Sequence, residues 1–169
     1  MKITLIGYMG SGKTSIGKIL SKKSKLKFYD LDELLMRDQK KSISNIFKDK
    51  GEKVFRKIEH TMVKNFLKKH HKYIFSVGGG TPCYYDNMNL LNLLSKTFYL
   101  KGDAETLFKR LYKEKKKRPL ISHLSKNELF LFIKKHLSER VFFYEKSYKE
   151  IEIKEKSKYE IAQQIFDSL

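Results

Sequence analysis

The chain has 169 residues, one cysteine and a formal net charge of +18, from 37 lysines and arginines against 19 acidic residues. This length predicts a single domain, residues 1–169, whose hydrophobic core needs no disulfide. The lone Cys83 excludes an internal disulfide and favours a reducing compartment. No apolar run approaches the roughly 18 residues of a membrane span, and the first strand follows Met1 almost directly. We therefore expect no membrane association, no signal peptide and a cytoplasmic location.

The excess positive charge is distributed in short lysine runs along the whole chain. A strongly basic protein can bind nucleic acid, but no nucleic-acid-binding motif accompanies these lysines. We therefore predict no nucleic-acid partner, and interpret the lysines as solvated surface that attracts anionic substrates. The alternative is a basic nucleic-acid-binding protein whose nucleotide site acts as a switch. That alternative predicts tight DNA or RNA binding that weakens steeply with salt.

The strongest motif comes first in the chain. The apolar run Ile3–Ile6 predicts a buried strand, and the segment Gly7–Thr14 that follows it reads GYMGSGKT. This segment fits the phosphate-binding pattern G-x-x-x-x-G-K-[ST] at every fixed position. Apolar residues then recur at helical spacing, so a helix begins where the loop ends. The motif predicts a nucleoside triphosphate site, with Lys13 on the β- and γ-phosphates and the Thr14 hydroxyl on Mg²⁺.

Two aspartates follow a short second strand, Lys27–Asp30. Asp30 and Asp32 stand at i and i+2, which in a continuing strand would point both carboxylates the same way. In open α/β sheets, ligands bind beyond the carboxyl ends of the strands, so we expect both side chains near the phosphates and the metal. The alternative is that Asp32 only caps the helix around Glu33–Met36.

A long helix is predicted over Gly51–His71, after a small helix or ordered connection within Asp38–Lys50. Arg56 and Glu59 are i, i+3 neighbours on that helix. A surface ion pair is one interpretation. In the other, Glu59 fixes the Arg56 guanidinium for a planar carboxylate of a ligand.

The predicted third strand, Tyr73–Val77, leads into three consecutive glycines, Gly78–Gly80. Three residues without side chains suggest that a ligand lies against bare backbone, and a flexible hinge is the competing interpretation. A helix is expected over Tyr84–Leu94, followed by a fourth strand over Lys96–Leu100.

In the last third of the chain, Asp103 is expected to cap a helix that carries Arg110. The polar run Lys113–Leu120, with its Arg118–Pro119 step, predicts a mobile lid over the phosphates; a solvated charge run is the alternative. The remaining elements are a helix over Asn127–Tyr144 that carries Arg140, a strand over Tyr148–Ile153 and a helix over Tyr159–Leu169. Alternating strands and helices predict an α/β fold with a parallel sheet covered on both faces.

Taken together, these motifs resemble the shikimate kinases, small-molecule kinases of the P-loop class. The elements that carry the resemblance are Gly7–Thr14, Asp30–Asp32, Phe55–Glu59, Gly78–Gly80 and Arg118–Leu120 followed by Arg140. The resemblance implies a three-layer α/β/α sandwich with a five-stranded parallel sheet in the order 2-3-1-4-5. It also implies a monomer that takes shikimate and ATP as substrates, with Mg²⁺.

The resemblance further implies a role for each matching residue. Catalysis would rest on Lys13, Asp32 and Arg118. Shikimate would contact Asp32, Arg56, Gly78, Gly79 and Arg140, within a substrate-binding region over about residues 32–70. ATP would contact Gly10, Ser11, Gly12, Lys13, Thr14, Ser15, Arg110 and Arg118, the last from a lid over about residues 112–124. Thr14 and Asp30 would hold the metal.

The expected reaction is the ATP-dependent phosphorylation of the 3-hydroxyl of shikimate, in chorismate and aromatic amino acid biosynthesis. Phosphoryl transfer needs positioning and positive charge more than a strong base, which suits Lys13 and Arg118. Asp32 would orient, and could deprotonate, the hydroxyl. A gluconate or nucleotide kinase is the nearest alternative. Neither would need two arginines for a carboxylate together with the triple glycine.

Overall fold

The computed structural model describes residues 1–169 in full, as five strands, seven α-helices and two 3-10 turns. The strands are β1 (Lys2–Ile6), β2 (Phe28–Asp30), β3 (Tyr73–Ser76), β4 (Lys96–Lys101) and β5 (Lys149–Glu152). The first helices are α1 (Lys13–Ser24), α2 (Leu31–Gln39), α3 (Ile43–Lys69) and α4 (Asn87–Leu94). The later helices are α5 (Ala104–Glu114), α6 (Lys126–Tyr144) and α7 (Lys158–Phe166). The 3-10 turns are η1 (Thr81–Cys83) and η2 (Lys115–Lys117).

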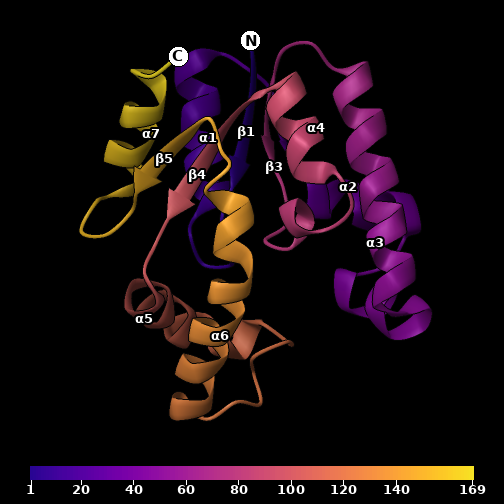
Figure 1. Ribbon diagram of the computed structural model, residues 1–169, viewed down its shortest axis with the longest axis vertical. Coiled ribbons are helices and arrows are strands. Elements are labelled where there is room, and N and C mark those ends of the chain that lie inside the picture. Colours follow the sequence, from indigo (N-terminus) through magenta and orange to yellow (C-terminus); the bar gives the residue numbers. More distant parts are fainter.

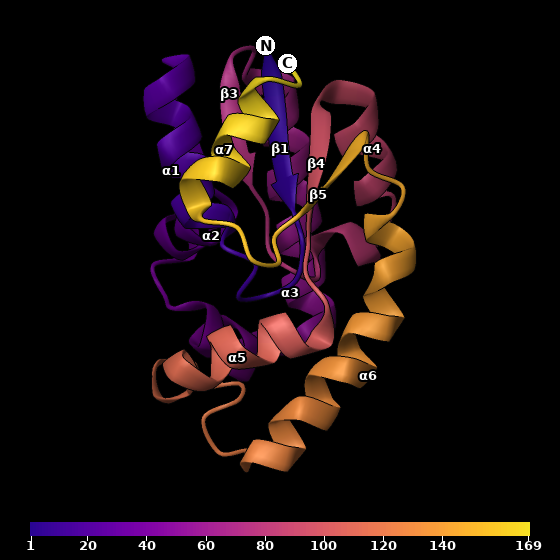
Figure 2. The same ribbon diagram turned by 90° about the vertical axis from the view of Figure 1, so that its left-hand side faces the viewer.

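The five strands form one sheet in the order β2-β3-β1-β4-β5, and every neighbouring pair is parallel. Helices α1 and α7 pack together on one face, and α3 and α4 cover the other (Figure 1). The predicted three-layer fold and strand order are therefore confirmed. Both chain ends lie at one end of the molecule, while α5 and α6 lie toward the end where the strand arrows point (Figures 1 and 2).

The central strand β1 explains why the site forms where it does. Ile3, Leu5 and Ile6 are fully buried, as expected for a parallel strand covered on both faces. Such a strand cannot carry polar function along its length, so function falls to the loop that follows it. The same holds for β3, whose four residues are all buried before the chain turns into the glycines.

Several helices differ from their predicted bounds: α7 ends at Phe166 and not at Leu169, and the differences at α4 and α3 have local causes. Helix α4 begins at Asn87 and not at Tyr84, because an irregular turn with Tyr85 at φ 51° follows η1 and occupies the intervening residues. Helix α3 runs on from Ile43, but Gly51 interrupts it with φ 74° and ψ 168°. The predicted break between a small helix and a long one therefore lies at Gly51. Asp103 caps α5 as predicted, because its Oδ1 accepts from the Thr106 amide at 2.7 Å.

No helix is both long enough and apolar enough to cross a membrane.

The packing of α1 on the sheet yields a stability prediction. A Cβ at Gly17 would lie 2.3 Å from Cε2 of Phe28 on β2. Gly17→Ala should therefore lower the melting temperature, because overpacking costs about 1–3 kcal/mol. This outweighs the ~1 kcal/mol that alanine gains over glycine in a helix. Thermal unfolding measures it, with the exposed neighbour Lys18→Ala as control. The double variant Gly17→Ala/Phe28→Leu should recover part of the loss, and a melting temperature raised by Gly17→Ala alone would contradict the packing argument.

Candidate active site

The loop between β1 and α1 is held in a conformation that requires glycine. Gly10 and Gly12 have φ of 78° and 94°, in the left-handed region, and Gly12 is the N-cap of α1. A Cβ at Gly7 would lie 2.9 Å from the Leu100 carbonyl oxygen. The loop thus turns tightly into the N-terminus of α1, where unpaired amides and the helix dipole attract anions. Lys13 folds back over the loop, with Nζ donating to the Gly7 and Tyr8 carbonyls at 2.7 and 3.0 Å.

The two aspartates have different structural roles. Asp30 is the N-cap of α2, and its Oδ1 accepts from the Asp32 amide at 3.0 Å. Asp32 lies in the first turn of α2, so neither the continuing strand nor capping by Asp32 is correct. The helical turn nevertheless brings the Asp32 side chain to the cleft described below. The Thr14 hydroxyl donates to Asp30 Oδ2 at 2.8 Å, which joins two hard oxygen groups of the kind that Mg²⁺ prefers.

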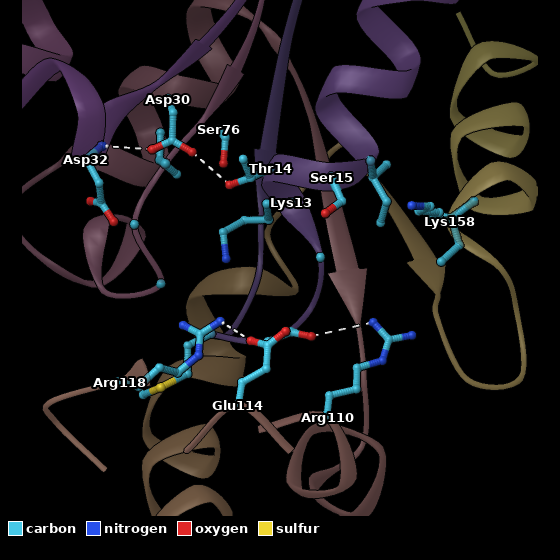
Figure 3. A pocket seen from close by; sticks show the side chains of 18 of the residues that line it. Lys13, Thr14, Ser15, Asp30, Asp32, Ser76, Arg110, Glu114, Arg118 and Lys158 are labelled. Atoms are coloured by element: carbon cyan, nitrogen blue, oxygen red, sulfur yellow. Dashed lines mark hydrogen bonds and ion pairs between the residues drawn. The ribbon is translucent and has the colours of Figure 1, made fainter. Parts of the chain in front are cut away.

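A cleft of about 560 Å³ lies beyond the carboxyl ends of the strands. Figure 3 shows its two walls: Lys13, Thr14 and Asp32 lie on one side, and Arg110, Glu114 and Arg118 lie on the other. The predicted site residues that line it are Gly10, Gly12, Lys13, Thr14, Ser15, Asp30, Asp32, Gly78, Gly79, Arg110 and Arg118. Ser11, in the same loop, is 0% exposed and does not line the cleft.

The charges of the cleft perturb one another. Burial lowers the pKa of Lys13 to about 8, although the Asp32 and Asp30 carboxylates oppose that shift. Burial raises the pKa of Asp32 to about 6, and the charge of Asp30 adds to the increase while Lys13 reduces it. An aspartate with a raised pKa is better matched to accepting a proton near neutral pH than an ordinary one. Burial against neighbouring charges in a cleft is typical of functional sites.

Arg56 and Glu59 form a buried ion pair beside the glycines. Arg56 Nη1 donates to Glu59 Oε1 at 2.8 Å, and the two residues are 8% and 1% exposed. The surface ion pair is therefore wrong, and Glu59 fixes the guanidinium. The Arg56 guanidinium also lies 4.1 Å from the ring centre of Tyr84. A Cβ at Gly80 would be 2.5 Å from Arg56 Nη2, so the third glycine makes room for the arginine.

Arg140 reaches the same turn from α6. A Cβ at Gly79 would lie 3.2 Å from Arg140 Nη1, and the Tyr144 hydroxyl donates to the Gly79 carbonyl at 2.5 Å. Neither Arg56 nor Arg140 lines the cleft itself. Both guanidinium groups lie against the glycine turn that forms part of its wall, so the three glycines bring the two arginines together.

The second wall of the cleft carries two more cations. Arg118 Nη2 donates to Glu114 Oε2 at 2.9 Å, and these side chains are 37% and 56% exposed. Arg110 donates to the Ser11 carbonyl at 3.3 Å and to the Ile153 carbonyl at 3.4 Å. Arg110 therefore bridges the phosphate loop and the segment that leads to α7.

Sequence reasoning missed the lining residues Ser76, Lys158 and Ile161, and it included Lys113 and Glu114 only as part of the expected lid. Ser76 could have been found, because it ends β3 and pairs in register with Asp30. Lys158 begins α7, which reaches the cleft through packing against α1. No local pattern marks that approach, and Figure 3 shows Lys158 at the opposite end of the cleft from Asp32.

The fold and the cleft define a class of protein: a P-loop phosphotransferase, with a nucleotide loop facing cationic side chains across the cleft. The sequence profile of the shikimate kinase family matches residues 9–169. A shikimate kinase from Flavobacterium psychrophilum is 46% identical over 167 residues, which are 97% of this chain and 96% of the relative. This chain belongs to the shikimate kinase family.

Solved structures agree. A crystal structure of shikimate kinase from Bacteroides thetaiotaomicron superposes with a TM-score of 0.92 and 32% identity, covering 98% of this chain and 96% of that one. Shikimate kinase from Acinetobacter baumannii in complex with shikimate superposes with a TM-score of 0.86 and 27% identity, covering 98% and 90%.

The raised pKa of Asp32 predicts that its charge weakens the fold. A folded-state pKa of about 6, above the ordinary 3.8, means that stability is present at low pH and is lost as pH rises through about 6. In metal-free buffer with EDTA, Asp32→Asn should therefore be more stable than the parent by about 1–2 kcal/mol at pH 8. The gain should disappear toward pH 4.

Chemical denaturation across that pH range measures the effect, with the exposed neighbour Glu33→Gln as control. A gain in stability that is equal at pH 4 and pH 8 would contradict this account of Asp32.

Proposed function

We propose that this chain transfers the γ-phosphoryl group of ATP to the 3-hydroxyl of shikimate. The observation that carries the proposal is the meeting of Arg56 and Arg140 at the Gly78–Gly80 turn, next to the cleft that holds Lys13 and Asp32. Two arginines on bare backbone suit a small acceptor with a carboxylate. A nucleotide loop in the same cleft suits a polyphosphate donor.

The donor half of the cleft would take ATP. The backbone amides of residues 10–15 would receive the phosphates, together with Lys13 Nζ once it leaves the loop carbonyls. Thr14 and Asp30 would hold Mg²⁺, which supplies charge neutralisation for the phosphate oxygens when bound. Arg110, fixed between the loop and the Ile153 carbonyl, would lie against the adenine.

The acceptor half would take shikimate. The forked guanidinium groups of Arg56 and Arg140 would bind its carboxylate, and the backbone of Gly78 and Gly79 would contact the ring. Asp32 lies close to that turn, since a Cβ at Gly78 would be 3.5 Å from Asp32 Oδ1. This proximity supports Asp32 as the group that would accept the proton of the acceptor's 3-hydroxyl.

In the transfer, the hydroxyl oxygen attacks the γ-phosphorus while the bond to the β–γ bridging oxygen breaks and ADP leaves. The hydroxyl proton passes to Asp32. Lys13 and Arg118 stabilise the charge spread over the transferring group. The lid, about residues 112–124, would close over the phosphates and exclude water, while about residues 32–70 carry most of the acceptor contacts.

We also propose that the enzyme acts as a monomer, because both halves of the cleft come from one chain. A cytoplasmic location is supported by the lone Cys83, which fits a reducing compartment, and by the supply of ATP there. The product would enter chorismate and aromatic amino acid biosynthesis, the pathway that the family implies.

The acceptor is tested by a coupled ADP-release assay with shikimate, gluconate and nucleoside monophosphates. Turnover is expected with shikimate as the acceptor and not with gluconate or nucleoside monophosphates. Arg56→Lys should raise the KM for shikimate by at least tenfold and leave the KM for ATP unchanged, because lysine cannot form the forked contact. Arg37→Lys, an exposed arginine on α2, is the matched control.

An unchanged KM for shikimate in Arg56→Lys would remove Arg56 from the acceptor site. Absence of kinase activity together with nucleic-acid binding at physiological salt would overturn the proposed function altogether.

A further inference from the structure

Behind the Arg56–Glu59 pair lies a second, fully buried hydrogen bond. Glu59 uses its two carboxylate oxygens for different partners: Oε1 accepts from Arg56 Nη1 at 2.8 Å, and Oε2 accepts from the Thr81 hydroxyl at 2.7 Å. Thr81 is 0% exposed and Glu59 is 1% exposed. With both oxygens engaged, the carboxylate cannot rotate without breaking a bond to a charged group, which is worth about twice a neutral hydrogen bond.

Thr81 is itself fixed from two directions. Its amide donates to the Gly78 carbonyl at 3.1 Å, which closes the turn over the three glycines. Its own carbonyl accepts from Asn87 Nδ2 at 2.9 Å, and Asn87 is 0% exposed. The backbone of Thr81 is therefore held in place, and its hydroxyl links the glycine turn to Glu59 on α3.

The hydrogen bonds continue from Thr81 through Asn87 to His60. Because Asn87 Nδ2 donates to Thr81, its Oδ1 must be the acceptor in the 2.7 Å contact with His60 Nδ1, so His60 carries its proton on Nδ1. His60 also stacks on Tyr85, with ring centres 4.9 Å apart. One continuous hydrogen-bonded series thus joins His60, Asn87, Thr81, Glu59 and Arg56 across α3, η1 and α4.

We propose that Thr81 is a positioning residue for acceptor binding: its hydroxyl orients Glu59, and Glu59 holds the Arg56 guanidinium in the plane needed for a carboxylate. This inference rests on the function proposed above. Thr81 does not touch the acceptor in this assignment and acts through Glu59 alone.

The alternative role for Thr81 is purely structural, in which its hydroxyl only satisfies a buried carboxylate. The two roles differ in what they change. A hydrogen bond with a purely structural role contributes only to the free energy of unfolding. A hydrogen bond with a positioning role also sets the affinity for the carboxylate of the acceptor. Arg56 would hold that carboxylate equally before and during transfer, so losing its alignment raises KM and leaves kcat unchanged.

The test compares Thr81→Val, which keeps the shape and removes the hydroxyl, with Thr81→Ser, which keeps the hydroxyl. Thr81→Val should raise the KM for shikimate about tenfold, with kcat and the KM for ATP within a factor of two of the parent. Thr81→Ser should restore the KM to within threefold. Thr4→Val is the matched control. Thr4 lies on β1, is also 0% exposed, and its hydroxyl forms a hydrogen bond of 2.7 Å with the side-chain oxygen of Ser95.

A second measurement identifies the group that the effect passes through. With the neutral methyl ester of shikimate as acceptor, Thr81→Val and the parent should have equal KM values, because the interaction at issue is with the carboxylate. If Thr81→Val does not fold, Thr81→Ala against Thr81→Ser makes the same comparison.

An unchanged KM for shikimate in Thr81→Val, with a melting temperature lowered as in Thr4→Val, would overturn the inference and leave the proposed function intact. An equal loss for shikimate and its methyl ester would also overturn it. Failure of the parent enzyme to phosphorylate shikimate would instead refute the proposed function.

Discussion

The parallel direction of all five strands is the constraint on which the rest of this molecule depends. Because every strand ends at one edge, each loop that carries function leaves the sheet at the same place. The phosphate loop follows β1, Asp30 ends β2 with Asp32 just beyond it, and the three glycines follow β3. Residues separated by up to seventy positions in the chain thus converge at or just beyond the carboxyl ends of the strands, outside the mainly apolar core.

Convergence has an energetic consequence, because the burial of the gathered side chains disfavours their ionised forms. Burial lowers the pKa of Lys13 to about 8 and raises that of Asp32 to about 6, so both values approach neutral pH from opposite sides. The ionised form of each side chain would be more stable in water than in the cleft, and the surrounding fold keeps both side chains in place. Phosphoryl transfer to an alcohol uses a lysine that stays positively charged beside a polyphosphate and a carboxylate that readily takes a proton.

The sequence predicted the parts of the site whose chemistry is local. Residue type and spacing predicted the phosphate loop, the cap at Asp103 and the break at Gly51. The sheet order was predicted from the family resemblance. Features set by tertiary packing were not predictable in the same way. Arg56 and Glu59 share a face by spacing, but their burial depends on Phe47, Phe55 and Tyr84 packing around the guanidinium. The cap at Asp30 was missed because β2 ends at Asp30, two residues earlier than a strand carrying both aspartates would. Lys158 carries no signal, since its approach depends on α7 packing against α1.

The arginines of the site are held by partners of very different strength, and that difference separates a rigid half from a movable one. Breaking the buried Arg56–Glu59 pair would leave a charge uncompensated in the interior, at a cost of about 3–5 kcal/mol. The Arg118–Glu114 pair is partly exposed, and exposed pairs contribute about 0–1 kcal/mol. In the proposed function, a phosphate that enters the cleft would therefore take Arg118 from Glu114 at little cost, whereas an acceptor carboxylate would join Arg56 without displacing Glu59. The proposed acceptor side would then be built before any ligand arrives, and Arg118 would exchange its partner when the nucleotide binds.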